Sequence, residues 1–242
     1  MKKALLCVAL VGPMLVAGVA PAAAQASSPK VGVAVKVGVL GAGVDVAVPI
    51  GAKVNIRGGF SGFSLSQEFE DGGITLDAKL KLRSASAHLD WFPFGGGFHL
   101  SPGVMLYNGN EMNAVARVPG GTSFSLGNAD YISNAANPVT GTADVVFKRV
   151  AQSLMMGWGN VVPRGSRRWS IPFELGVVFS KAPTATLNLA GSVCDTRGLN
   201  CRNLATDAGL QADVREQEAE INANIDILKF IPVFSLGFAF SF

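Results

Sequence analysis

Eleven charged or imidazole side chains occupy the polar positions of stretches in which every second residue is apolar or small. Ammonium, guanidinium, imidazole and carboxylate groups on one face could form a network of ion pairs, attract small charged solutes or transfer protons. We therefore predict that they line an interior lumen. The candidate lumen-lining set is Lys36, Asp45, Arg57, Asp77, Lys79, Lys81, Arg83, His88, Asp90, His99 and Glu174.

The sequence contains no recognisable catalytic motif around these charged and imidazole groups. The two histidines, His88 and His99, lie on either side of the glycines 95–97. Neither G-x-S-x-G nor H-E-x-x-H occurs, and no serine forms a recognisable motif with either histidine. We expect no enzyme activity and no cofactor.

The segment 230–242 shows which element carries such side chains. Aromatic or aliphatic residues alternate with small or polar ones up to the last residue, Phe242. A tilted strand of ~9–11 residues crosses a bilayer, and a transmembrane barrel requires this alternation. The ending resembles that of bacterial outer-membrane proteins, whose terminal Phe is read by the outer-membrane assembly machinery. That resemblance implies the same partner for Phe242.

The N-terminal segment 1–26 has the features of a cleaved signal peptide. Lys2 and Lys3 precede an apolar run over 4–19, and small residues at 22–26 suit cleavage after Ala26. The remaining chain, 27–242, is one domain by length, with 18 basic and 17 acidic residues once these two lysines are removed. This balance gives no indication of nucleic-acid binding.

No later apolar run is long enough for a membrane-spanning helix. An exported chain that is apolar on average can then satisfy its backbone in lipid only as a closed barrel. Because bacterial single-chain barrels have even strand numbers, we divide 31–48 at the glycines 41–43, although one bulged strand would give the same pattern. The eight predicted antiparallel strands cover 31–40, 43–48, 54–68, 74–91, 98–118, 140–161, 168–189 and 230–242.

The strand 74–91 shows a change of phase near 84–86. Before it, the charged residues 77, 79, 81 and 83 alternate with leucines and Ala78, and after it His88 and Asp90 alternate with Leu89 and Trp91. A slip of one residue exchanges the two faces of a strand, so we predict a bulge there that keeps all the charged residues inward.

The connections divide into short turns and long loops. Turns at 49–52, 93–97 and 162–167 are predicted on the periplasmic side, and outer loops at 68–73, 119–139 and 190–225. Apolar residues at helical spacing predict an amphipathic helix over 207–228, either lying over the rim or acting as a plug or partner-binding element. Cys194 and Cys201, in the last loop, predict a disulfide in this oxidising compartment, whereas zinc would need two further ligands.

A soluble lipocalin-like barrel would have the same alternation with its faces reversed. Aromatic residues near strand ends, which suit an interfacial girdle, favour the membrane instead. They are Trp91, Phe92, Phe94, Trp158 and Trp169.

Several segments together resemble small proteobacterial outer-membrane β-barrel proteins, and the layout is similar to that of the carbapenem-associated outer-membrane protein, an ornithine uptake porin family. The resemblance implies a bacterial outer-membrane location and uptake of basic amino acids, but it transfers no functional residue, because the shared segments are turns and lipid-facing strands. They are 40–43 (LGAG), 55–63 (NIRGGFSGF), 90–95 (DWFPFG), 157–160 (GWGN), 174–177 (ELGV) and 232–237 (PVFSLG).

An eight-stranded barrel is only just wide enough for side chains to fill it. We therefore expect either a passive channel for small charged solutes or a structural barrel with a salt-bridged lumen. The alternative is a surface-interaction protein that acts through its long outer loops. Outer-membrane lipids surround a monomer in each case.

Overall fold

The computed structural model describes residues 30–164 and 166–242. The predicted signal peptide, 1–26, lies outside these residues. Eight antiparallel strands of the described chain close into a barrel, in which β1 pairs with both β2 and β16. They are β1 (Gly32–Gly38), β2 (Gly41–Gly51), β3 (Val54–Asp71), β4 (Ile74–Trp91), β5 (His99–Asn108), β10 (Ala151–Trp158), β12 (Phe173–Phe179) and β16 (Phe230–Ser241).

The predicted all-β barrel of eight strands is confirmed, including the division of the first Val-rich stretch. β1 and β2 are separate strands that face each other from Gly32↔Ala47 to Gly38↔Gly41 across the turn 39–40. No helix in the described part of the chain is both long and apolar enough to cross a membrane.

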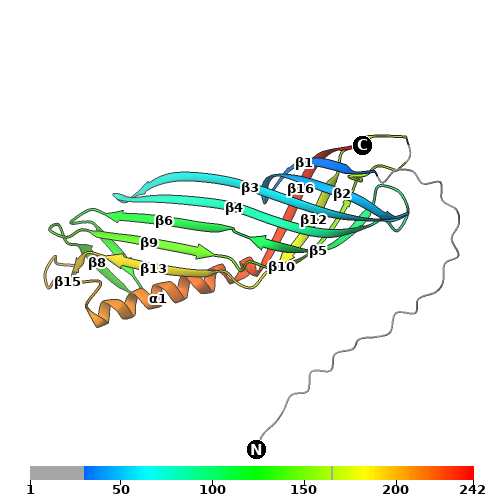
Figure 1. Ribbon diagram of the computed structural model, residues 1–242. Helices are drawn as coiled ribbons and strands as arrows, with labels where there is room; N and C mark the ends of the chain where they lie inside the picture. The colour runs from blue at the N-terminus through cyan, green and yellow to red at the C-terminus, as the bar shows by residue number, and fades with distance from the viewer. Residues whose placement is uncertain (1–29, 165) are drawn as a thin grey trace, which may run out of the picture.

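β3 and β4 continue beyond the barrel into a second region, which we call the outer extension (Figure 1). There β4 pairs with β6 and not with β5, and a five-stranded sheet forms in the order β3, β4, β6, β9, β13. Its added strands are β6 (Glu111–Val118), β9 (Val139–Val146) and β13 (Thr184–Ala190). A two-residue strand, β11 (Trp169–Ser170), pairs with β16 at the other end of the barrel.

The predicted outer loops 119–139 and 190–225 are folded and not simply exposed. They contribute four strands of a small sheet and the helix α1 to the outer extension, and the short helix η1 follows α1 directly. The elements are β7 (Ser123–Leu126), β8 (Ala129–Ser133), β14 (Ser192–Cys194), β15 (Arg202–Asn203), α1 (Ala208–Ile225) and η1 (Asp226–Lys229). The predicted disulfide Cys194–Cys201 is present and begins at the last residue of β14.

The outer extension has its own hydrophobic core. Leu204 and Leu210 are fully buried, together with Val118, Leu126, Val139, Val193 and Val214. α1 begins after Asp207, whose carboxylate accepts hydrogen bonds from two backbone N–H groups of the first turn. The predicted helix is therefore present, and it lies along the sheet edge at β13.

The side chains of α1 satisfy that sheet edge. Asn222 accepts a hydrogen bond from the Ala185 N–H and donates one to the Ala185 carbonyl, and Glu218 accepts from the Leu187 N–H. Unpaired edge groups invite pairing with other chains, so this contact protects β13.

The phase change in β4 does not come from a bulge in the β3–β4 hairpin. The polar and apolar residues exchange faces where the strand leaves the barrel. The β3–β4 ladder runs from Val54↔Trp91 to Asp71↔Ile74 in one unbroken register. Even-numbered residues of β4 therefore share one face along the whole strand; that face is polar in the barrel and apolar in the outer extension. The shift near Ala85 lies instead in the ladder with β5.

This register corrects four predicted lumen residues. Asp77, Lys79, Lys81 and Arg83 have odd numbers, so they lie on the outward face of β4, above the outward Leu89 and Trp91. Their place beyond the barrel explains why a charged outward face is tolerated there.

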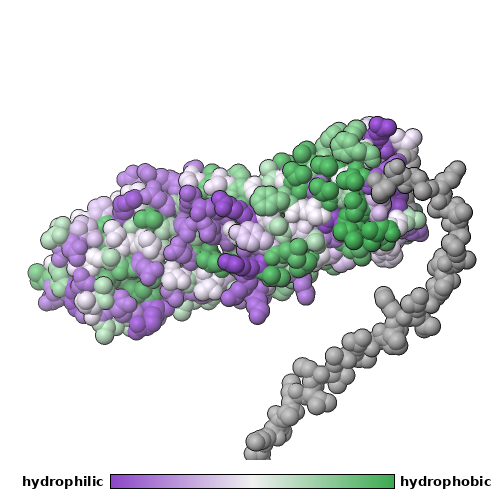
Figure 2. All heavy atoms as spheres, in the orientation of Figure 1, coloured by the Kyte–Doolittle hydropathy of each residue, from purple (hydrophilic) through white to green (hydrophobic). Residues whose placement is uncertain are grey.

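The barrel and the outer extension also differ in their surfaces. Figure 2 shows hydrophobic residues gathered over the barrel end and hydrophilic ones over the outer extension. The barrel exposes side chains such as Val44, Leu154 and Phe238 while burying Arg57 and Asp45. A lipocalin-like barrel would show the opposite, so the soluble alternative is wrong. β10, with 8 residues, covers about 20 Å of a ~25 Å apolar band when tilted ~40°.

Candidate functional site

Arg57 of β3 is the centre of the lumen, and three carboxylates surround it. Its Nε donates to Asp90 Oδ2 at 2.9 Å, and its Nη1 donates to Asp45 Oδ2 at 2.9 Å and to Glu174 Oε2 at 3.1 Å. Nη2 donates to Asp90 and to Glu174 as well. The guanidinium is 2% exposed, so these charges are held away from bulk water.

Further polar groups complete this lumen cluster. Lys36 Nζ lies 2.7 Å from Asp45 Oδ1, and Ser101 Oγ donates to Asp90 Oδ1 at 2.7 Å. His99 Nε2 lies 3.2 Å from Glu174 Oε1. Buried charges are tolerated when they are paired and hydrogen-bonded in this way. Each carboxylate of the cluster thus contacts a cationic side chain of the same chain.

Glycines opposite these side chains make the space for them. A Cβ at Gly59 would lie 2.1 Å from Asp45 Oδ1, and one at Gly157 would lie 3.0 Å from both Glu174 Cγ and His99 Cε1. Small residues facing large ones allow a narrow barrel to be filled. The strand glycines therefore permit the cluster to close the lumen.

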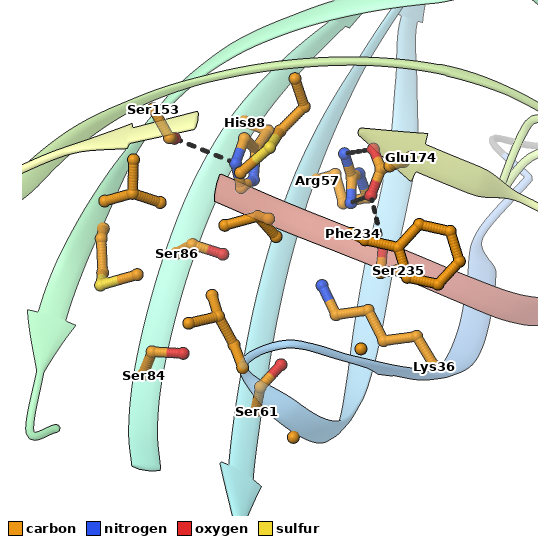
Figure 3. A pocket seen from close by; sticks show the side chains of 17 residues that line it. Lys36, Arg57, Ser61, Ser84, Ser86, His88, Ser153, Glu174, Phe234 and Ser235 are labelled. Carbon is orange, nitrogen blue, oxygen red and sulfur yellow. Dashed lines mark hydrogen bonds and ion pairs between the residues drawn. The ribbon is translucent and has the colours of Figure 1, made fainter. Parts of the chain in front are cut away.

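A small cavity lies beside the lumen cluster (Figure 3). Its volume is about 40 Å³, enough for a few water molecules. The hydroxyls of Ser61, Ser84, Ser86 and Ser153 line it with His88, whose Nε2 lies 3.2 Å from Ser153 Oγ. Met105, Met155, Val178 and Val233, from the neighbouring strands β5, β10, β12 and β16, pack together at this cavity. This apolar layer narrows the passage further.

The other end of the lumen is closed by the connection after β10. Val161 and Val162 are buried against Ala34, Ala47 and Ala239 of the barrel wall. The predicted turn 162–167 is therefore part of a segment that enters the barrel.

Polar contacts hold this segment in place. Asn55 donates to Asn160 Oδ1 at 2.8 Å, and Arg164 donates to the Gly51 carbonyl at 2.9 Å. The guanidinium of Arg164 also stacks on Phe92, which is 1% exposed. Phe92 is thus a lumen residue and not part of the predicted aromatic girdle. The cavity on this side of Arg57 is about 10 Å³, the size of one water molecule.

The structure brings seven of the eleven predicted lumen residues together, although the sequence does not give their pairing. They are Lys36, Asp45, Arg57, His88, Asp90, His99 and Glu174. Strand parity could have added Asn55, two residues before Arg57, and Ser101, two residues after His99. Asn160 to Val162 leave the regular alternation, so no pattern indicated that they enter the lumen.

The chemistry of the cluster is that of a closed ion-pair network. The geometry offers no group of three or more His, Cys, Asp or Glu side chains suited to a metal within the described residues. His88 pairs with Ser153, and among the described residues no carboxylate forms a hydrogen bond with His88.

No protein-family model and no curated protein matches the chain. Among solved structures, Acinetobacter baumannii CarO matches with a TM-score of 0.54 and 22% sequence identity, over 86% of this chain and 96% of that chain. Acinetobacter baumannii CarO2 matches with a TM-score of 0.58 and 20% identity, over 89% of this chain and 100% of that chain. The fold is similar to that of CarO.

CarO is the carbapenem-associated outer-membrane protein, so the predicted resemblance is confirmed for the fold. At this level of identity the likeness to CarO concerns the fold alone. The chain is thus a barrel with a CarO-like fold and an apolar outer surface.

Proposed function

We propose that the protein is a bacterial outer-membrane barrel that is closed to solutes and anchors its outer extension at the cell surface, where the extension contacts a partner. The observation that carries this proposal is the filled lumen: Arg57 is bound by three carboxylates, with an apolar layer and a buried connection flanking it. Assembly through Phe242 belongs to the same proposal.

The outer extension supports the second half of the proposal. Its sheet, helix and disulfide enclose a separate hydrophobic core, which a passive rim of loops would not need. Loops and projections on a rigid scaffold are common binding elements.

Planar-bilayer conductance of the refolded protein tests whether the barrel is closed. The unfolded and folded forms are first distinguished by the gel mobility shift on heating. We expect no discrete conductance steps from folded protein. Steps that Glu174→Gln alters would instead establish a path through the lumen and overturn the closed barrel.

Surface labelling tests where the outer extension lies. Ser66→Cys, on the β3 strand of the outer extension, should react with a membrane-impermeant maleimide on intact cells, whereas Ala52→Cys, at the opposite end of the barrel, should not. Both positions are exposed, so their reactivity reports which side of the membrane they face. Equal labelling of both, or labelling of Ala52→Cys alone, would contradict the proposed orientation.

A gated path for small cationic solutes is the second candidate. Three carboxylates converge on Arg57, and they could bind the cationic group of a solute if that side chain moved aside. Arg57→Ala provides the test, because it should produce cation-selective steps if Arg57 is the only barrier. A silent Arg57→Ala barrel would favour closure by the whole lumen.

A further inference from the structure

A basic groove lies on the outward face where the barrel passes into the outer extension. Its volume is about 200 Å³. We define the basic groove by the residues that line it: Lys81, Arg83, Tyr107, Asn108, Gly109, Asn110, Glu111, Val146, Phe147 and Arg149.

The basic groove exists because two ladders separate at this level. β5 and β10 are paired up to Met105↔Ala151, and β6 and β9 begin at Glu111↔Val146. The intervening segments 106–110 and 147–150 leave the regular pairing and open the surface between them.

Backbone hydrogen bonds fix the floor of the basic groove. The Asn108 N–H donates to the Arg149 carbonyl at 2.7 Å, and the Gly109 N–H donates to the Arg83 carbonyl at 2.7 Å. The Arg83 N–H in turn donates to Asn110 Oδ1 at 2.9 Å. The two arginines therefore extend from a fixed backbone, which reduces the cost of ordering them around a ligand.

The charges of the basic groove suit an anion. Lys81, Arg83 and Arg149 line it with a single carboxylate, Glu111, which pairs with Lys81 at 2.5 Å. Within the described part of the chain, no carboxylate pairs with Arg83 or Arg149. Two such guanidinium groups match the oxygens of a phosphate, because each can donate two parallel hydrogen bonds.

The height of the basic groove indicates a lipid source for that phosphate. Ala85, immediately below Arg83 on the same face, pairs with Tyr107 at the upper limit of the apolar barrel surface. The Tyr107 hydroxyl lies over Gly109, since a Cβ there would be 2.4 Å from Tyr107 Oη. Tyrosine is enriched at the membrane interface. Phosphate would thus meet the arginines while the attached acyl chains lie along the barrel wall.

We propose that the basic groove binds a phosphate group of lipid A, the anionic glycolipid part of lipopolysaccharide in the outer leaflet. This inference rests on the proposed outer-membrane location. It adds a ligand site that neither the lumen nor the protein-contacting role of the extension requires.

Binding of purified lipid A to the refolded, detergent-solubilised protein tests the site. The test variant combines Arg83→Gln and Arg149→Gln, and the control is Arg117→Gln, an exposed arginine farther out on the same face. We expect the double variant to bind lipid A at least about tenfold more weakly, since two charge-assisted contacts are lost. Arg117→Gln should bind like the wild type. Equal binding by the double variant would overturn the site.

Two further ligands identify the source of the phosphate. Lipid A freed of phosphate should bind the wild type about as weakly as intact lipid A binds the double variant. If the wild type bound intact and dephosphorylated lipid A equally well, phosphate recognition would be overturned. Inorganic phosphate should not compete at millimolar concentration, and competition would assign the basic groove to a soluble anion. The mobility shift and surface labelling test folding and location separately, so a failed lipid site leaves the proposed function intact.

Discussion

β3 and β4 pass through two regions of the molecule, and their chemistry reverses on the way. In the barrel, Arg57 and His88 face inward as directly paired neighbours, while Ile56 and Leu89 face outward. In the outer extension, the same face carries leucines and phenylalanines, of which Phe63, Leu65 and Phe69 are exposed, and the opposite face carries charges. The backbone register is the same throughout, so the reversal lies in the residue types and not in the strand geometry.

The comparison shows how one hairpin can belong to two regions with different surroundings. Lipid accepts apolar side chains outside the barrel, so polar groups must pair within it. In the outer extension, apolar groups gather around Leu204 and Leu210, and Ile74 of the hairpin packs against them. The hairpin therefore joins the barrel, with its apolar outer surface, to the outer extension without a linker.

Removal of the lumen cation should have the largest effect. Arg57→Met leaves three buried carboxylates without their shared partner, and we expect a loss of about 3–5 kcal/mol in the free energy of unfolding. Urea unfolding of the protein refolded into vesicles provides the measurement. The matched variant Arg117→Gln breaks the exposed Arg117–Asp77 pair of the outer extension and should cost less than about 1 kcal/mol.

Restoring charge balance provides the control for Arg57→Met. Adding Asp90→Asn and Glu174→Gln to that variant should recover part of the lost stability. Similarly small losses of unfolding free energy for Arg57→Met and Arg117→Gln would show that water reaches the lumen cluster. Ion pairs in the barrel and in the outer extension would then not differ in strength.

Exchanging charge and leucine along one face of β4 tests the inversion directly. Leu89→Lys places a charge on the lipid side and should destabilise the barrel by about 2–4 kcal/mol near the bilayer midplane. Lys79→Leu, on the same face in the outer extension, should change stability by less than about 0.5 kcal/mol. Urea unfolding in vesicles measures both variants. A gain of about 2 kcal/mol or more from Lys79→Leu would mean that residue 79 also lies in lipid.

Truncating the core of the outer extension should separate the two regions. Leu210→Ala removes a fully buried side chain, and we expect a local loss of about 2–3 kcal/mol. Hydrogen exchange should accelerate in α1 and the β7–β8 hairpin while barrel amides keep their protection. Leu199→Ala, at an exposed position near the disulfide, is the control and should leave exchange in α1 unchanged. Simultaneous loss of protection in the barrel would make the molecule one cooperative unit.

Acid should produce the smallest effect, confined to the disulfide loop. The Leu199 N–H, the Asn200 side chain and the Arg197 N–H donate to Asp195 and lower the pKa of its carboxyl. A lowered native pKa means that this stabilisation is complete above the ordinary carboxyl pKa near ~4 and is lost as the pH falls through the native value.

Hydrogen exchange of the loop amides between pH 2 and pH 6 would follow this change after correction for the intrinsic rate. Protection should fall only at the acidic end in the wild type. Asp195→Asn should remove the pH dependence, and an unchanged profile in that variant would assign the dependence to another group.

The alternation in the sequence was sufficient to predict the barrel, because a strand exposes its side chains to two sides with a period of two. The even strand number resolved the division of 31–48, and the helical spacing at 207–228 indicated α1. Seven of the lumen residues followed from the same parity. Asp77 to Arg83 did not, because parity shows that faces differ and does not show which solvent each face meets.

Local sequence determined the strands, the turns, the disulfide and the helix, since each depends on neighbours along the chain. Only the tertiary structure decided that Arg57 bonds Asp45, Asp90 and Glu174, which come from three other strands. It also decided that Val161 and Val162 enter the barrel and that β4 changes environment at Ser84. These features depend on which surfaces meet lipid, water or each other, and that follows from closure of the barrel as a whole.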